Sequence, residues 1–175
     1  MSNVVFLCTG NAARSVMATV VARHHAPDLG VRGAGTFSIP GLPMSQRTRE
    51  ALAGAGLADP HHRSHQLEQS DVDWADLIVG FEPQHVHYVR RTHPEARART
   101  VTLPRLVRDL EGGDAPLLSR IGALDAGQLE VEPWEEVVDP AGGDQAAFDR
   151  CLAEITELMN KLLPRLLARP VRSVP

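Results

Sequence analysis

Residues 4–15 have the sequence VVFLCTGNAARS. The first four of them are apolar and of types that form strands, and Cys8 follows them directly. A glycine and an asparagine then interrupt the apolar pattern, and apolar residues recur at helical spacing from Ala13 up to Pro27. The stretch therefore predicts a strand buried on both faces, a short loop that begins at Cys8, and a helix.

The rest of the chain repeats this alternation of strand and helix. Further strands are predicted at 31–36, 76–81 and 99–103, and helices at 47–55, 82–92 and 148–163. We expect Ser45 to cap the helix at 47–55, short helices between 104 and 133, and an end or kink of the last helix at Pro164. Strands that alternate with helices predict a three-layer α/β fold, a four-stranded parallel sheet with helices on both faces.

The composition limits the class of protein. Of the 175 residues, 43% are hydrophobic and 23% charged, so we expect one globular domain over residues 1–175. The net charge of −4 predicts no nucleic-acid partner, and the apolar run at 4–8 is too short for a signal or membrane helix, so no membrane partner is expected. The two cysteines, Cys8 and Cys151, are too few for a disulfide framework and favour a reducing, cytoplasmic location.

The loop after Cys8 has the chemistry of an anion site. In an open parallel sheet, ligands bind outside the carboxyl ends of the strands, and Cys8 lies at such an end. Backbone N–H groups from Thr9 to Arg14 can curl around one point, backed by the start of the next helix. The same field favours ionisation of a thiol, so we expect Cys8 to be a thiolate near neutral pH.

Two further side chains fit this site. The planar guanidinium of Arg14 matches two oxygens of a phosphate, and Ser15 can donate a hydrogen bond to the sulfur of Cys8. A thiolate below a bound phosphoryl group is then set for in-line attack. The alternative is a buried structural cysteine beside a solvated arginine. A nucleotide-binding loop is disfavoured, because the lysine of a Walker motif is missing and residues 33–41 carry no dinucleotide fingerprint.

The motif CTGNAARS at 8–15 resembles the C-x5-R-S phosphate loop of the low-molecular-weight protein tyrosine phosphatases, and of the arsenate reductases that share their fold. The family's second signature, an Asp-Pro pair, is matched by Asp139 and Pro140 within EEVVDPAGGD. Between them, GAGT at 33–36, HHRSHQL at 61–67 and DLIVGF at 76–81 resemble family landmarks in the expected order. The resemblance covers nearly the whole chain.

The resemblance implies three catalytic residues. Cys8 would be the nucleophile, and Arg14 would clamp the transition state. Asp139 would protonate the leaving oxygen and later activate water, although an aspartate before proline is by itself also an ordinary turn residue.

It also implies supporting residues. Asn11 would hold the loop in a strained shape, Ser15 would stabilise the thiolate, and His62 would support Asn11. No metal and no cofactor is expected. The residues expected to bind the phosphate are Thr9, Gly10, Asn11, Ala12, Ala13, Arg14 and Ser15.

The walls of the substrate slot depart from the family. Family phosphatases usually carry an aromatic residue directly after Asp-Pro, whereas Ala141 stands there in this chain. Phe37 and Ile39 are the candidate walls on the other side. We therefore expect modest discrimination between aryl and small alkyl phosphates.

Two other departures concern arsenate reduction. Thr9 replaces a more usual aliphatic residue and favours the reductase branch, but Ala13 stands where those reductases have a second cysteine. Cys151 lies among apolar residues of the last predicted helix and is expected in the core. A reductase cycle through an internal disulfide is thus disfavoured.

The leading prediction is a phosphatase that hydrolyses phosphate monoesters through a cysteinyl-phosphate intermediate. Its substrate would be a phosphorylated protein or a small aryl phosphate, with phosphotyrosine or another aryl phosphate as the reacting group. One alternative is a single-cysteine arsenate reductase relative that uses an external thiol. The other is a non-catalytic phosphate-binding module.

Other charged residues carry weaker signals. The histidines at 61, 62 and 65 lack the matching ligands of a metal site. His85 and His87 lie two apart on a predicted helix, so they do not face one site. A locally basic stretch is interpreted as a solvated face; it comprises Arg90, Arg91, Arg97, Arg99, Arg105 and Arg108.

Overall fold

The computed structural model describes residues 2–167. Within them, four parallel strands form one sheet with the order β2-β1-β3-β4. The strands are β1 (Asn3–Cys8), β2 (Gly30–Gly35), β3 (Leu77–Gly80) and β4 (Thr100–Thr102). Because β2 and β3 lie on opposite sides of β1, the chain reverses its winding at β1, and the carboxyl end of β1 lies where doubly wound sheets bind ligands.

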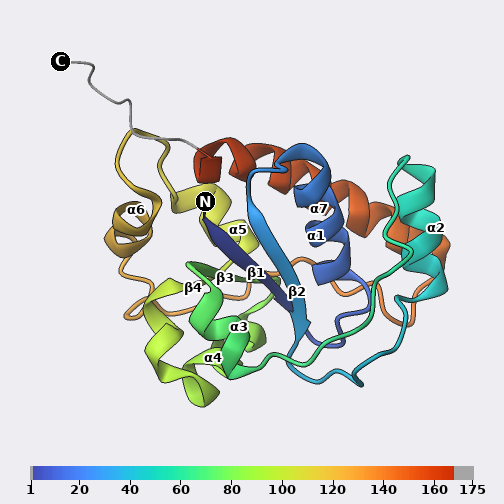
Figure 1. The fold of residues 1–175 in the computed structure, drawn as a ribbon, viewed down its shortest axis with the longest axis horizontal. Coiled ribbons are helices and arrows are strands. Elements are labelled where there is room, and N and C mark those ends of the chain that lie inside the picture. The colour runs from blue at the N-terminus through green and yellow to red at the C-terminus, as the bar shows by residue number, and fades with distance from the viewer. Residues whose placement is uncertain (1, 168–175) are drawn as a thin grey trace.

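Helices cover both faces of this sheet (Figure 1). One face packs against α1 (Arg14–His25), α5 (Leu103–Asp109) and α7 (Gln145–Leu167), and α2 (Gln46–Gly54) packs against α7. The other face packs against α3 (Gln69–Trp74), α4 (Pro83–Thr92) and the 3₁₀ helix η1 (Pro94–Arg99). The short α6 (Leu117–Ala123) lies in the excursion between α5 and α7. The predicted three-layer fold is confirmed.

The alternation of side chains along β1 explains the two cores. Phe6 and Cys8 belong to the core that contains α1 and α7, whereas Val5 and Leu7 belong to the core that contains α3 and α4. All four are buried, as the unbroken apolar run predicts for a strand covered on both faces. Because the side chains of β1 alternate between the two faces of the sheet, the thiol of Cys8 points toward the start of α1.

Most predicted elements occur within one or two residues of their expected bounds. Ser45 caps α2 by accepting a hydrogen bond from Thr48 N at 3.1 Å, and Cys151 is buried in the core, as predicted. Two elements were not predicted, α3 and η1, each only six residues long.

The last helix was predicted to end or kink at Pro164, and the predicted end is wrong, because α7 runs past Pro164 to Leu167. A proline inside a helix removes one backbone hydrogen bond. Leu163 and Leu166 are buried on either side of it, so packing of this last turn outweighs the local cost.

No helix in residues 2–167 is both long enough and apolar enough to cross a bilayer.

Candidate active site

The loop between β1 and α1 is held from outside through its carbonyl groups. Phe37 N donates to Thr9 O at 2.9 Å, and Thr48 Oγ1 donates to Ala12 O at 2.8 Å. His62 Nε2 lies 2.9 Å from Asn11 O. By contrast, the hydrogen bonds of residues 2–167 give the N–H groups of residues 10–13 no acceptor. The loop therefore has its carbonyls engaged by neighbours and a set of unpaired donors, as an anion-binding nest requires.

Asn11 fixes the shape of this loop. Its φ of 49° lies in the left-handed region, which asparagine tolerates better than most residues. The side chain is fully buried: Nδ2 donates to Ser15 Oγ at 2.8 Å, and Oδ1 accepts from His65 N at 2.9 Å. Asn11 thus joins the loop to the start of α1 and to the segment that carries His65.

The contact between Asn11 and Ser15 also orients the Ser15 hydroxyl. Ser15 Oγ lies 3.0 Å from Cys8 Sγ and accepts a hydrogen bond from Asn11 Nδ2. Since that bond uses an acceptor position on the hydroxyl, its hydrogen is free to turn toward the sulfur. Asn11 therefore orients Ser15 so that its hydroxyl can donate a hydrogen bond to Cys8. Cys8 itself is buried, with an exposed fraction of 3%.

Arg14 connects three segments of the chain. Its Nη1 donates to Glu82 Oε2 at 2.6 Å and to Val137 O at 3.0 Å, and its Nη2 donates to Asp139 Oδ2 at 2.7 Å. Burial opposes the charge of Arg14, but the hydrogen bond to Glu82 and the charges of Asp139, Glu82 and Cys8 raise its pKa overall. The guanidinium is therefore a permanent cation beside the loop, although its exposed fraction is only 1%.

Asp139 lies at the mouth of the site. Its side chain is 40% exposed, Oδ2 pairs with Arg14, and Oδ1 accepts from Ala141 N at 3.0 Å. Two segments that are 125 positions apart in sequence thus meet through one ion pair. The structure brings together Cys8, Ser15, Asn11, Arg14, Asp139 and His62, all of which the sequence analysis singled out.

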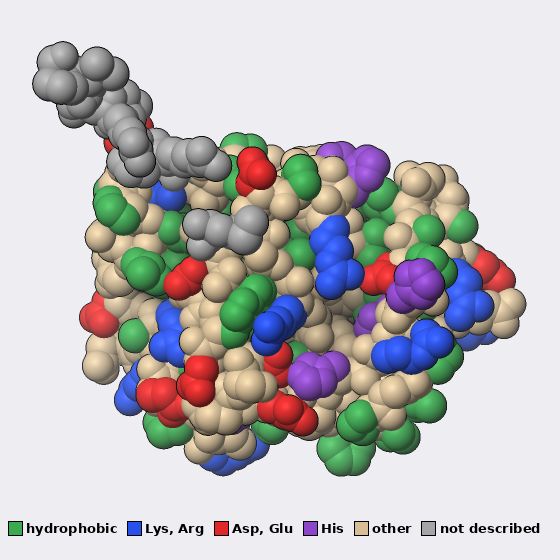
Figure 2. Space-filling model, in the orientation of Figure 1, with side chains coloured by type: hydrophobic (Ala, Val, Ile, Leu, Met, Phe, Trp, Pro, Cys, Tyr) green, Lys and Arg blue, Asp and Glu red, His purple; other side chains and the backbone are tan. Residues whose placement is uncertain are grey.

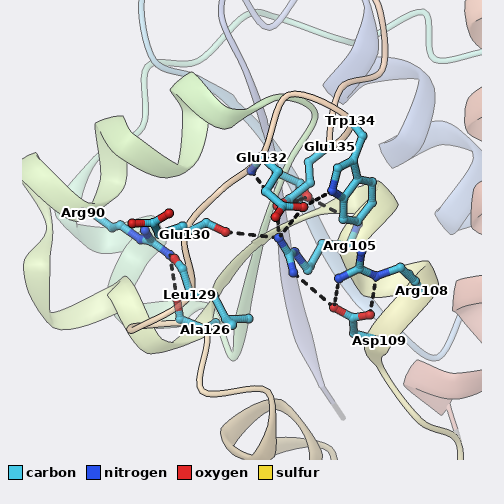
Figure 3. Close-up of polar contacts among 11 residues, drawn as sticks. Arg90, Arg105, Arg108, Asp109, Ala126, Leu129, Glu130, Glu132, Trp134 and Glu135 are labelled. Atoms are coloured by element: carbon cyan, nitrogen blue, oxygen red, sulfur yellow. Dashed lines mark hydrogen bonds and ion pairs between the residues drawn. The ribbon is translucent and has the colours of Figure 1, made fainter.

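The segment that leads to Asp139 is anchored to β4 and α5 (Figure 3). Glu135 is buried, pairs with Arg105 Nη2 and accepts from Thr102 Oγ1 at 2.6 Å. Burial opposes ionisation of Glu135, but the hydrogen bonds from Arg105 and Thr102 lower its pKa overall. The Trp134 ring lies against the guanidinium of Arg108, 4.1 Å from centroid to Cζ.

The basic stretch is therefore not simply a solvated face. Arg90 Nη2 donates to Ala126 O and Leu129 O, and Arg97 donates to Gly127 O. With the Arg105–Glu135 pair, these contacts fix the excursion between α5 and α7 and so the approach to Asp139.

The histidine cluster lines a hollow of about 590 Å³, rimmed by arginine and histidine side chains (Figure 2). His65 Nε2 contacts Asp71 Oδ2 at 2.6 Å, and burial, as the largest effect, lowers the pKa of His62. Across residues 2–167, no group of three or more His, Cys, Asp or Glu is arranged to hold a metal ion. In this structure, His62 and the backbone of His65 contact Asn11 instead.

Glu82 and His85 are site residues that the sequence analysis missed. Glu82 is the buried carboxylate partner of Arg14, and His85 is fully buried with Nε2 at 3.2 Å from Thr9 Oγ1. Burial, together with the charge of Arg14, lowers the pKa of His85 to about 3. One feature of the sequence could have identified them as site residues. Both follow a buried strand that neighbours β1, at the edge of the sheet where the Cys8 loop lies.

Comparison with known proteins agrees with this geometry. The family model for low molecular weight phosphotyrosine protein phosphatases matches residues 3–117. The chain belongs to this family. It is a phosphatase, as the sequence predicted.

Relatives and solved structures extend the match over almost the entire chain. A low molecular weight protein-tyrosine-phosphatase from Streptomyces coelicolor is 30% identical over 170 residues, 91% of this chain and 90% of the relative. A protein-arginine-phosphatase from Geobacillus stearothermophilus is 26% identical over 164 residues, 93% of this chain and 95% of the relative. The structure of the YwlE arginine phosphatase from that organism has a TM-score of 0.77 and covers 95% of this chain, and this chain covers 93% of it. Dephosphorylation of arginine was not among the functions predicted from the sequence.

The depressed pKa of His85 predicts how stability depends on pH. Below about pH 6.5 the unfolded chain binds a proton at His85 that the folded chain does not bind until about pH 3. The free energy of unfolding should therefore be fully retained above pH 6.5 and fall as the pH drops, by up to about 1.4 kcal/mol per pH unit from this group. Denaturant unfolding at pH 7, 6 and 5 measures it.

His85→Asn tests the assignment of this slope. Asparagine keeps an acceptor near the backbone but cannot titrate, so the variant should lose less stability between pH 7 and pH 5 than the parent. Identical pH slopes in the two proteins would show that His85 is not the titrating group.

Proposed function

We propose that this chain dephosphorylates phosphorylated protein side chains, with Cys8 as the nucleophile. The observation that carries the proposal is the loop at 9–13, in which the carbonyls are engaged from outside while the N–H groups of residues 10–13 have no acceptor among the described residues. Such a nest of donors, with the thiol of Cys8 at its start and Arg14 beside it, suits a phosphoryl group.

In the first step, Cys8 Sγ attacks phosphorus as the bond from phosphorus to the leaving atom breaks. An arginine has five N–H donors, and Arg14 uses three of them on Glu82, Val137 O and Asp139. The remaining two, on Nε and Nη2, would bind the phosphoryl oxygens together with the loop N–H groups. Asp139, which is paired with Arg14 in this structure, would have to enter this step carrying a proton, which it gives to the leaving atom.

In the second step, the same carboxylate takes a proton from water. The water oxygen attacks phosphorus, the bond between phosphorus and sulfur breaks, and Cys8 departs as a thiolate. The Ser15 hydroxyl, 3.0 Å from the sulfur, stabilises that thiolate. Inorganic phosphate and the regenerated enzyme result.

The substrate slot is open. Phe37 is 83% exposed and Ile39 68% exposed, and Ala141 is an exposed alanine rather than an aromatic wall. Phosphotyrosine would therefore bind with a wall on one side only. Phosphoarginine is a second candidate, because relatives named as arginine phosphatases match over 93% and 94% of this chain.

We propose the cytoplasm as the compartment, since Cys8 and Cys151 are both free thiols and the reaction needs a reduced Cys8.

Phosphopeptides test the proposal directly. The parent should release phosphate from phosphotyrosine and phosphoarginine peptides of the same sequence, and Cys8→Ser should lose at least about 1,000-fold in kcat, because a hydroxyl is hardly ionised at neutral pH. Cys151→Ser is the matched control and should retain activity. Turnover by Cys8→Ser at the parental rate would exclude the mechanism.

A leaving-group series tests Asp139. A poor leaving group needs a proton as its bond to phosphorus breaks, whereas an acidic phenol hardly does. Asp139→Asn should therefore lower kcat for phosphotyrosine by about 100-fold or more, but much less for an activated aryl phosphate. Equal losses on both substrates would mean that Asp139 only shapes its segment, and Asp144→Asn provides the control within it.

A further inference from the structure

His85 lies behind the Cys8 loop with a fixed hydrogen-bond pattern. Phe81 N donates to His85 Nδ1 at 3.1 Å, so Nδ1 is an acceptor and the single proton of the neutral ring is on Nε2. Nε2 lies 3.2 Å from Thr9 Oγ1 and 3.6 Å from Glu82 Oε1. The closer partner is the threonine, so we assign the Nε2–H bond to Thr9.

This bond determines what the Thr9 hydroxyl can do. Because His85 donates to Thr9 Oγ1, the hydroxyl hydrogen must turn away from the histidine. Thr9 is half-buried, and its side chain has no other hydrogen-bond partner among residues 2–167. A hydroxyl donor is thus held in the loop directly after the nucleophile.

Burial and, after it, the charge of Arg14 keep the ring of His85 neutral. Two charged groups face His85: Arg14 from α1, and Glu82 from the residue that precedes α4. Arg14 opposes protonation of the ring, and Glu82 is itself paired with Arg14. With its pKa lowered to about 3, chiefly by burial, the ring of His85 is neutral at mildly acidic and neutral pH.

We propose that His85 is a positioning residue, which turns the Thr9 hydroxyl into a fixed donor to the tetrahedral oxyanion bound in the Cys8 loop. The inference rests on the proposed function, since it assigns the phosphoryl group to this loop. His85 does not touch the substrate; it acts through Thr9. The ring also links α4 to the catalytic loop, since His85 is the third residue of that helix.

A double-mutant cycle on phosphate binding tests the proposal without turnover. Thr9→Val removes the hydroxyl at nearly constant shape, and His85→Asn keeps an acceptor for Phe81 N but does not reach Thr9. Inorganic phosphate, titrated by calorimetry, should bind about 10-fold more weakly to each variant, as expected when a hydrogen bond to a charged group is lost. The double variant should bind no more weakly than the weaker single variant, because His85 has no hydroxyl left to orient once Thr9→Val has removed it.

Two further variants serve as controls. His87→Asn changes an exposed histidine of the same helix and should leave phosphate binding unchanged. His85→Gln retains a longer side chain with a donor amide and should recover part of the lost affinity, which mere disruption of packing would not allow. The proposal would be overturned if the losses of phosphate affinity in the two single variants were additive, or if Thr9→Val bound phosphate with parental affinity. The result for Thr9→Val tests the proposal even if His85→Asn does not fold.

Alkylation of Cys8 tests whether the Thr9 hydroxyl donates its hydrogen bond to the bound anion or to the thiolate of Cys8. The pH dependence of iodoacetamide labelling should be the same in Thr9→Val and the parent, with Cys151→Ser as the common background. A shift of that profile would show that the hydroxyl serves the sulfur and would overturn the proposal. Failure of peptide turnover alongside a non-additive binding cycle would instead reject the proposed function and leave the His85–Thr9 pair standing.

Discussion

A buried guanidinium is the constraint on which the rest of the site depends. Removing a charge from water is costly unless that charge is paired and its hydrogen bonds are satisfied. Arg14 is paired with Glu82 and Asp139 and donates to the carbonyl of Val137, and its two remaining N–H donors are left for a bound anion. These partners come from the start of α4 and from the segment before α7, so both must converge on the start of α1. The ion pairs thus join the segments that carry the nucleophile and the general acid proposed here.

The convergence is supported on each side by contacts that do not involve the loop. Val137 N donates to Phe81 O at 2.7 Å, which joins the segment before α7 to the end of β3. Further back, Glu135 is tied to β4 and α5 through Thr102 and Arg105. On the other side of the loop, the left-handed Asn11 is held by Ser15, His62 and the backbone of His65. The loop is therefore held by contacts from neighbouring segments, which is the condition for electrostatic stabilisation without reorganisation.

Much of this architecture follows from sequence patterns. The apolar run at 4–7, followed by Cys8 and a helix, predicts the position of the loop because parallel strands end at one edge. Asp139 was found only through a resemblance to known phosphatases, since an aspartate before proline is by itself an ordinary turn residue. The short α3 and η1 were missed because six residues carry little helical periodicity.

Glu82 and His85 were missed for a different physical reason. Their importance arises from the depth at which they are buried and from partners 68 and 76 positions away, which no local pattern encodes. The role of the basic stretch was also mispredicted, because its partners are distant in the sequence. Spacing alone suggested a solvated face, whereas Arg90, Arg97 and Arg105 bind carbonyls or a carboxylate of the excursion. Tertiary partners decide whether a charged residue is solvated or structural.

The most direct test of the central claim is the turnover of Arg14→Lys. Lysine keeps the positive charge, but one ammonium group cannot replace a fork that serves Glu82, Val137 O, Asp139 and two phosphoryl oxygens. Arg23→Lys, on the same helix but exposed and paired with Asp59, is the matched control and should turn over like the parent. We predict that kcat for a phosphotyrosine peptide falls by about 100-fold or more in Arg14→Lys. A kcat within about threefold of the parent would contradict the account, because charge alone would then organise the site.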